Sequence, residues 1–217
     1  MSVSPASPRL VKGGLVLVDP DSSAVLRIIA LQYNPDTLTR SLQVQAVGGE
    51  SQGRSEALRI KGPPVETIKL DAEIDAVDQQ ERGDPTAAQV GIHPQLAALE
   101  TIVYPTTRQL QSTNALAQSG TLEVAPMEAP LTLFIWSKNR LVPVRITDFS
   151  ITEEAFDPAL NPIRAKVSLG MRVLSVQDIG FSQPGGSLYM AYQQQKERLA
   201  TRDRAGTLGA LGIGGLP

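Results

Sequence analysis

The sequence predicts a mainly β protein: an antiparallel β-sandwich or a partly open barrel with one internal helix, and a second helix near the C-terminus. Three observations support this class. About six stretches alternate apolar and polar residues, or run apolar, over strand lengths. Residues that favour turns separate these stretches, and only two stretches repeat apolar residues at helical spacing. The antiparallel order follows from the short connections between several of them.

Residues 1–23 are rich in Ser, Pro and Gly and contain one short apolar run, Leu15 to Val18. We predict a flexible N-terminal arm, or an edge strand that becomes ordered on a partner. Residues 25–33 form a strand that is apolar on both faces, which is typical of a strand covered on both sides. Residues 38–46 alternate, and Asn34-Pro35-Asp36 is a turn sequence, so the two strands are predicted to pair as a hairpin.

Residues 65–75 alternate cleanly and predict a third strand with one buried face. Residues 76–91 are predicted to be a polar connector. Pro94 suits the first turn of a helix, and apolar residues then recur at helical spacing until Pro105. Residues 106–129 are predicted to be a second polar connector, mobile in the isolated protein.

Residues 130–150 predict a hairpin, with the polar turn Ser137 to Arg140 between its strands. Residues 161–173 predict a further long strand, and residues 187–204 a helix with a narrow apolar stripe. The predicted organisation is an N-terminal arm (1–23), a β domain (24–176), and a C-terminal helix with a flexible tail (177–217).

Composition excludes several classes of protein. The chain has 217 residues, 41% of them hydrophobic and 19% charged, with a formal charge of −2 and no cysteine. A disulfide scaffold and cysteine-ligated zinc are therefore excluded, and no overall charge attracts nucleic acid or an anionic membrane. No apolar run approaches the roughly 20 residues that span a bilayer. We expect no cofactor, no nucleic-acid partner and no direct membrane insertion.

The chain offers little for catalysis. His93 is the only histidine, and it stands next to the predicted helix start at Pro94. No serine-hydrolase elbow is present, and the glycine-rich stretches lack the spacing of a phosphate-binding loop. The sequence therefore predicts a protein that is not an enzyme.

Asp71, Glu73 and Asp75 share one face of the predicted strand 65–75. Alternate residues lie about 7 Å apart, a spacing that suits acid–base chemistry or a hard cation as well as a solvated strand face. A third interpretation is an interaction with the basic face of the last strand, either across a subunit contact or within one sheet. The basic residues of that face are Arg164, Lys166 and Arg172.

Phe134 and Trp136 share one face of a strand whose other face is also apolar. One interpretation is a core strand covered on both sides. The other is an aromatic anchor for a neighbouring subunit, since Trp is enriched at the energetic centres of interfaces. Both residues are interface candidates, together with the acidic and basic residues of the two strand faces.

A series of motifs in a fixed order resembles the tube-protein family of extracellular contractile injection systems, which are phage-tail-like particles. More narrowly, the chain resembles the baseplate tube initiator, the adaptor between spike and inner tube. The motifs span about residues 24–175 and are Tyr33-Asn34-Pro35-Asp36-Thr37-Leu38, Gly62-Pro63-Pro64 with Ile68 to Ala72, His93 to Leu99 with Tyr104-Pro105, Pro130 to Trp136, and Asp148 to Val167 with Phe156-Asp157-Pro158.

The resemblance implies a tail-tube fold, a homo-hexameric ring around a channel, and no catalysis. It also implies three sets of partners: the inner tube protein, a spike (VgrG-like) protein, and sheath or baseplate proteins. Assembly is expected in the cytoplasm as part of a particle released on lysis. Many adaptors carry a C-terminal LysM module, and this chain ends after one helix and a Gly/Leu tail.

Two other functions stay open from the sequence. One is a ligand-binding β-sandwich module for carbohydrate or peptide, which would need an exposed aromatic platform. The chain holds only four Tyr, four Phe and one Trp for such a platform. The other is a hydrolase that uses Asp71, Glu73 or Asp75.

Overall fold

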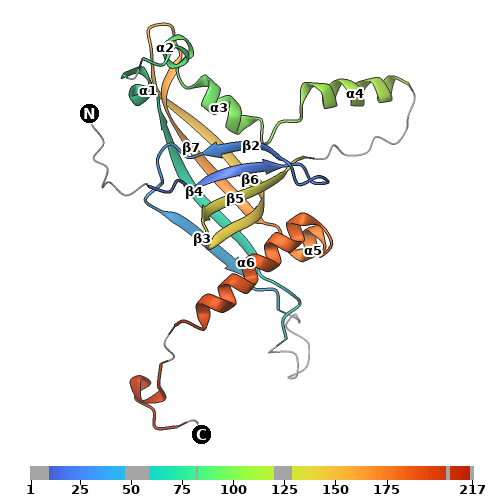
Figure 1. The fold of residues 1–217 in the computed structure, drawn as a ribbon, viewed down its shortest axis with the longest axis vertical. Coiled ribbons are helices and arrows are strands. Elements are labelled where there is room, and N and C mark those ends of the chain that lie inside the picture. Colours follow the sequence, from blue (N-terminus) through green and yellow to red (C-terminus); the bar gives the residue numbers. More distant parts are fainter. Residues whose placement is uncertain (1–9, 47–58, 82, 120–128, 204–205, 216–217) are drawn as a thin grey trace.

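The computed structural model describes residues 10–46, 59–81, 83–119, 129–203 and 206–215 (Figure 1). Within them, seven strands form one sheet in the order β2-β1-β5-β6-β7-β4-β3, and all neighbouring pairs are antiparallel. The strands are β1 (Gly14–Val18), β2 (Val25–Ala30), β3 (Leu38–Gln43), β4 (Val65–Asp75), β5 (Leu131–Ser137), β6 (Arg140–Phe156) and β7 (Pro162–Val173). The predicted mainly β, antiparallel class is confirmed, and a single sheet with open edges fits the partly open barrel.

The helices are α1 (Val77–Glu81), α2 (Pro85–Val90), α3 (His93–Glu100), α4 (Thr107–Gln118), α5 (Val176–Ile179) and α6 (Pro184–Ala200), with a 3-10 turn η1 (Leu208–Leu211). The predictions of α3 and α6 are confirmed. The two predicted connectors are wrong, because they contain α1, α2 and α4. Local caps explain these helices: the Asp84 side chain accepts from the backbone N–H of Thr86, and Thr106 and Gln109 form a capping box.

The core lies against the inner faces of β4 and β7, which the alternation of both strands predicts. Their buried side chains are Ile68, Leu70, Ala72, Ile74, Ala165, Val167, Leu169, Met171 and Val173. Leu96 and Leu99 of α3, and Tyr189 and Tyr192 of α6, join the same cluster. In Figure 1 these two helices lie at opposite ends of the strand bundle, so each covers a different part of the core.

A side-chain clamp draws the end of the β2 segment towards the end of β4. The Gln32 Nε2 donates to the Asp75 carbonyl at 2.7 Å, and the Asp75 N–H donates to Gln32 Oε1 at 3.0 Å. A side-chain amide thus provides the donor and acceptor that a neighbouring strand would provide. This contact joins the segment after β2 to the end of β4, although β2 and β4 are not neighbours in the sheet.

The prediction that residues 1–23 form a flexible arm or an edge strand is wrong at β1, and its first nine residues lie outside the described ranges. This strand lies inside the sheet, between β2 and β5, and four of its five residues are buried. Gly14 permits the close pairing, since a Cβ there would lie 2.5 Å from the Ile29 carbonyl oxygen. A short apolar run preceded by two glycines therefore forms a central strand here.

The predicted hairpin of residues 25–33 and 38–46 is also wrong. β2 pairs with β1 and β3 pairs with β4, so the two strands lie at opposite edges of the sheet. The Asn34 side chain accepts from the Gly13 N–H and donates to the Val11 carbonyl, both at 2.9 Å. Asn34 thereby ties the chain to the segment before β1, and the predicted turn does not close a hairpin.

Candidate assembly surfaces

One face of the β3-β4-β7-β6 half of the sheet is uniformly polar. The registers place rows of side chains across all four strands, for example Glu73 beside Lys166 and Lys166 beside Thr152. We call this surface the polar face: Thr39, Ser41, Lys69, Asp71, Glu73, Asp148, Ser150, Thr152, Arg164, Lys166 and Ser168. Strict alternation exposes these residues because their neighbours along each strand point into the core.

The acidic and basic strands predicted from the sequence are neighbours within one sheet. Arg164 Nε lies 2.8 Å from Asp75 Oδ2, and Lys166 Nζ lies 3.3 Å from Glu154 Oε1. The Ser168 hydroxyl donates to Asp71. Of the two arrangements that the sequence left open, the pairing within one sheet is the one observed. These exposed pairs contribute little to stability individually, but they balance the charge of the face.

Arg172, the third basic candidate, donates from Nη2 to Asp178 Oδ1 at 2.7 Å, so it ties β7 to the short helix α5. Among the described residues no group of three or more His, Cys, Asp or Glu side chains could hold a metal ion. Asp71, Glu73 and Asp75 keep the linear spacing of a strand, and Asp71 and Asp75 bind neighbouring side chains of β7. The arrangement is that of a solvated sheet face.

Phe134 is a core residue, 1% exposed, so its predicted outward role is wrong. Trp136 is half-buried, and its ring stacks on Phe134 with centroids 6.0 Å apart and planes at 24°. A Cβ on Gly13 would lie 2.6 Å from Trp136 Cε3, so the indole lies directly on the backbone before β1. An interface role for Trp136 stays a prediction.

Two strand edges of the polar half have no strand partner in the described chain. β3 is the last strand of the sheet. β5 pairs with β6 only as far as Val144, so the stretch from Arg145 to Phe156 is paired with β7 alone. Because strand direction alternates across an antiparallel sheet, β3 and β6 run in opposite directions.

A buried carboxylate attaches α6 to the sheet. Glu66 of β4 is 3% exposed, and its Oε1 accepts from Arg40 Nε at 2.7 Å and from the Tyr192 hydroxyl at 3.1 Å. Its Oε2 lies 3.0 Å from Lys196 Nζ, which also lies 4.0 Å from the centre of the Tyr192 ring. We call these four residues the Glu66 network; it joins β3, β4 and α6.

The Glu66 network shifts the pKa values of Glu66 and Tyr192. Burial acts to raise the pKa of Glu66, but the hydrogen bonds and charges of Lys196 and Arg40 outweigh it, and the pKa is lowered. Burial, followed by the Glu66 charge, raises the pKa of Tyr192 to about 12. Glu66 therefore stays ionised and Tyr192 stays a hydrogen-bond donor near neutral pH.

The sequence analysis missed Glu66, although the pattern of β4 contains a signal for it. Glu66 has the same parity as Ile68, Leu70 and Ala72, the side chains that face the core. An acidic residue at a core-facing position predicts a buried ion pair. Its partners Arg40 and Lys196 are distant in the sequence, so only the fold identifies them.

The exposed aromatic residues of the described ranges lie on four separate segments. Tyr33 follows β2, Tyr104 follows α3, Phe156 ends β6, and Phe181 lies between α5 and α6; they are 42%, 67%, 49% and 69% exposed. A carbohydrate-binding surface would need such rings on one surface. No described helix is long and apolar enough to cross a membrane.

Comparisons with solved structures found weak similarities, including two to gene transfer agent particles. No family model and no curated protein matches the chain. The tail of an empty gene transfer agent (GTA) particle is 13% identical, covering 74% of this chain and 90% of that chain with a TM-score of 0.29. The virion of a native gene transfer agent particle is 12% identical, covering 73% and 90%, with a TM-score of 0.27. Similarity at this level identifies neither a family nor a partner.

Proposed function

We propose that this chain is a structural subunit of a phage-tail-like contractile injection particle. In this proposal it forms a baseplate ring that joins the spike to the inner tube. The ordered motifs between residues 24 and 175 support the class of particle. The observation that carries the ring is the pair of open strand edges, β3 and the Arg145 to Phe156 part of β6, on the two sides of one polar sheet.

Rotation of copies about a common axis keeps the direction of each strand along that axis. β3 of one copy can therefore lie antiparallel beside the open part of β6 in the next copy, which continues the alternation of the sheet. Such head-to-tail contacts satisfy the unpaired backbone groups of both edges and close a ring when the rotation fits. The resemblance favours a homo-hexamer.

The polar face would line the channel of this ring. Acidic and basic side chains are mixed on this face, as in the pairs Arg164–Asp75 and Lys166–Glu154, and its other side chains include short Ser and Thr. A lining of this kind lacks a large field of one sign, so it would not hold a charged cargo strongly. The inner tube protein, the spike protein and the sheath or baseplate proteins are the proposed neighbours.

Adjacent proline substitutions in β3 test the proposal. Backbone N–H groups of an edge strand alternate between its partner and the open side, so one of Ser41→Pro and Leu42→Pro removes only an open N–H. That variant should keep the stability of the monomer and lose the ring in mass photometry and negative-stain images. Ser41→Ala and Leu42→Ala keep both N–H groups and serve as controls.

The assembly measurements need the tube and spike proteins as well as the chain alone. Rings, or a stable complex with either partner, are expected for the unmodified chain. A strictly monomeric chain that binds neither the tube protein nor the spike protein would contradict the proposal. Rings that survive both proline substitutions would exclude β3 as the contact.

A further inference from the structure

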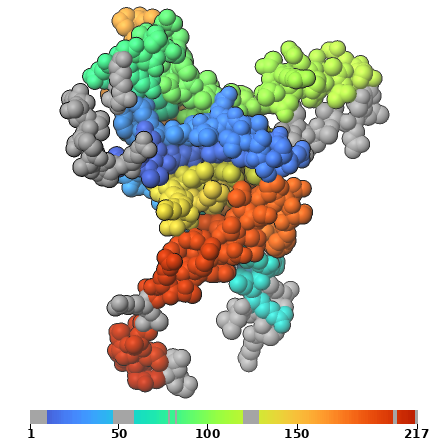
Figure 2. Space-filling model, viewed as in Figure 1, coloured from blue at the N-terminus to red at the C-terminus, as the bar shows by residue number. Residues whose placement is uncertain are grey.

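The edge strand β2 is the most exposed apolar element of the sheet. Val25, Leu26 and Ile28 are 60%, 54% and 70% exposed, whereas four of the five residues of the adjacent β1 are buried. Figure 2 shows the β1–β2 pair as a surface strip between α3 and the yellow β5–β6 hairpin. Soluble proteins protect open edges with charge, bulges or a cover, and β2 has only Arg27.

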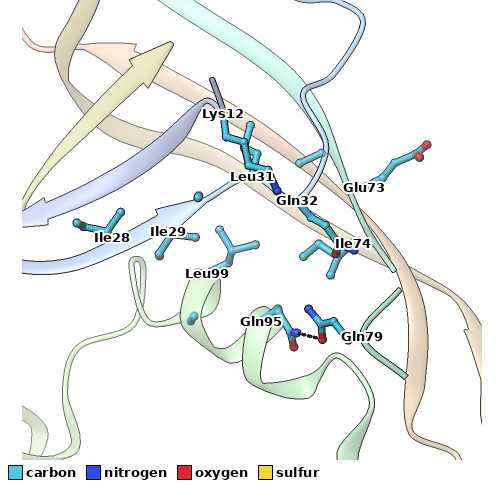
Figure 3. Close-up of a pocket in the computed structure, with 13 residues that line it drawn as sticks. Lys12, Ile28, Ile29, Leu31, Gln32, Glu73, Ile74, Gln79, Gln95 and Leu99 are labelled. Carbon is cyan, nitrogen blue, oxygen red and sulfur yellow. Dashed lines mark hydrogen bonds between the residues drawn. The ribbon is translucent and has the colours of Figure 1, made fainter. Parts of the chain in front are cut away.

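A cavity of about 330 Å³ lies beside the C-terminal end of β2, between this strand, α3 and the end of β4 (Figure 3). Its apolar lining includes Ile29, Leu31, Ile74 and Leu99. The volume suits one or two side chains of a strand that adds to the edge of β2. Strand addition of this kind combines backbone hydrogen bonds with pockets for alternate side chains.

Cations stand at both ends of this apolar surface. Arg27 lies early in β2 and donates from Nη1 to the Thr101 hydroxyl at 2.7 Å. Lys12 lines the cavity at the other end, together with Glu73 of β4. Within the described part of the chain neither cation forms an ion pair. A ligand with carboxylates at its ends would complement both.

We infer that β2 and its adjoining cavity form a docking edge for an extended segment of another protein. This segment has apolar residues at alternate positions and acidic residues at its ends. β2 lies outside the β3 and β6 edges proposed for the ring, so this inference does not rest on the proposed function.

A second copy of β2 is a poor occupant of the edge. The only charged residue of β2 is Arg27, so a second copy of this strand brings no carboxylate to pair with Arg27 or Lys12. The antiparallel register centred on Arg27 would also place two like charges opposite each other, which is unfavourable. The apolar faces attract, but the charge selects against self-pairing. A segment of a different chain, with apolar side chains and carboxylates, can pack on the apolar strand and also pair with the cations.

The test measures fluorescence anisotropy of labelled nine-residue peptides titrated with the full chain. One peptide alternates valine and threonine between two terminal aspartates, and a matched peptide carries lysine in place of both aspartates. We expect saturable binding of the acidic peptide and binding of the basic peptide that is weaker by about tenfold, since attraction becomes repulsion at each end. A proline at the centre of the acidic peptide should abolish binding.

Variants of the chain locate the site. Ile28→Asp should weaken binding of the acidic peptide at least about tenfold, and Arg27→Glu should reverse the preference between the two peptides. Leu160→Asp changes a residue that is 78% exposed on the β6–β7 loop, and should leave binding unchanged. Ile28→Asp should also leave ring assembly intact, which separates this site from the proposed ring contact.

Three outcomes would overturn the inference. The first is the lack of saturable binding by either peptide. The second is binding that Ile28→Asp and Arg27→Glu leave unchanged. The third is a dimer of the unmodified chain in sedimentation velocity that Ile28→Asp dissociates, because it would assign the edge to a second copy.

Discussion

The two halves of the sheet differ in how their strands are covered. The β3-β4-β7-β6 half has one buried face and one polar face, with acidic and basic strands side by side. The β2-β1-β5 half is built from strands that are apolar on both faces. β1 and β5 lie inside the sheet, whereas β2 lies at its edge and is exposed.

This difference shows what an apolar pattern does and does not predict. Alternation, as in β4, identifies a strand with one buried face and also shows which face that is. A strand that is apolar on both faces needs other protein segments packed on both sides, but its sequence does not show whether they come from the same chain or from a partner. In β1 the cover comes from the same subunit, and for β2 we propose that it comes from a partner.

The largest expected effect is at the core of the apolar half. Phe134→Ala removes a side chain that is 1% exposed and should lower the free energy of unfolding by about 3–5 kcal/mol. Urea denaturation measures the loss, and Phe156→Ala, at a residue that is 49% exposed, is a matched control with a small effect. Equal losses for the two variants would contradict the assignment of Phe134 to the core.

The second-largest loss of stability is expected from the Glu66 network, in the polar half of the sheet. Glu66→Ala leaves Arg40 and Lys196 without their shared carboxylate and should cost roughly 3 kcal/mol. Because α6 loses its anchor, limited trypsin digestion should cut sooner after Lys196 and Arg198. Glu153→Ala, at an exposed acidic residue, is the control. Unchanged digestion of α6 would show that the packing of Tyr189 and of the Tyr192 ring holds the helix without the Glu66 carboxylate.

Acid should weaken the same network. The pKa of Glu66 is lower in the folded chain than its usual value of 4.5, so its contribution to stability is complete above about that pH. The contribution is lost as the pH falls through the folded-state pKa. Urea midpoints should therefore decline less steeply with acid in Glu66→Gln than in the unmodified chain. Identical pH profiles would remove Glu66 from the acid response.

The smallest effect is expected on the polar face itself. A double-mutant cycle with Asp75→Ala and Arg164→Ala should give a coupling below about 1 kcal/mol that decreases with added salt. Thermal unfolding of the four chains measures it. A larger coupling, insensitive to salt, would show that the pairs hold the polar half together and do more than balance its charge.

Local patterns predicted much of the fold. β4, the β5–β6 hairpin, β7, α3 and α6 follow from alternation, turn residues and helical spacing, all of which are properties of neighbouring residues. The helices α1, α2 and α4 were missed because α1 and α2 are short and α4 is mostly polar, and because the caps of α2 at Asp84 and of α4 at Thr106 were not recognised.

Local residue patterns were enough to establish the mainly β fold class, the inward faces of β4 and β7, and the charges that those strands carry outward. The partners of the strands depended on the complete fold, in which β1 is central, β2 and β3 lie at opposite edges, and Glu66 meets Lys196. Alternation depends on neighbouring residues, whereas the choice of a strand's partner depends on contacts between distant ones. One example is the hydrogen bond from the Gly13 N–H to Asn34 Oδ1, which ties Asn34 to the segment before β1, where the sequence predicts a hairpin turn.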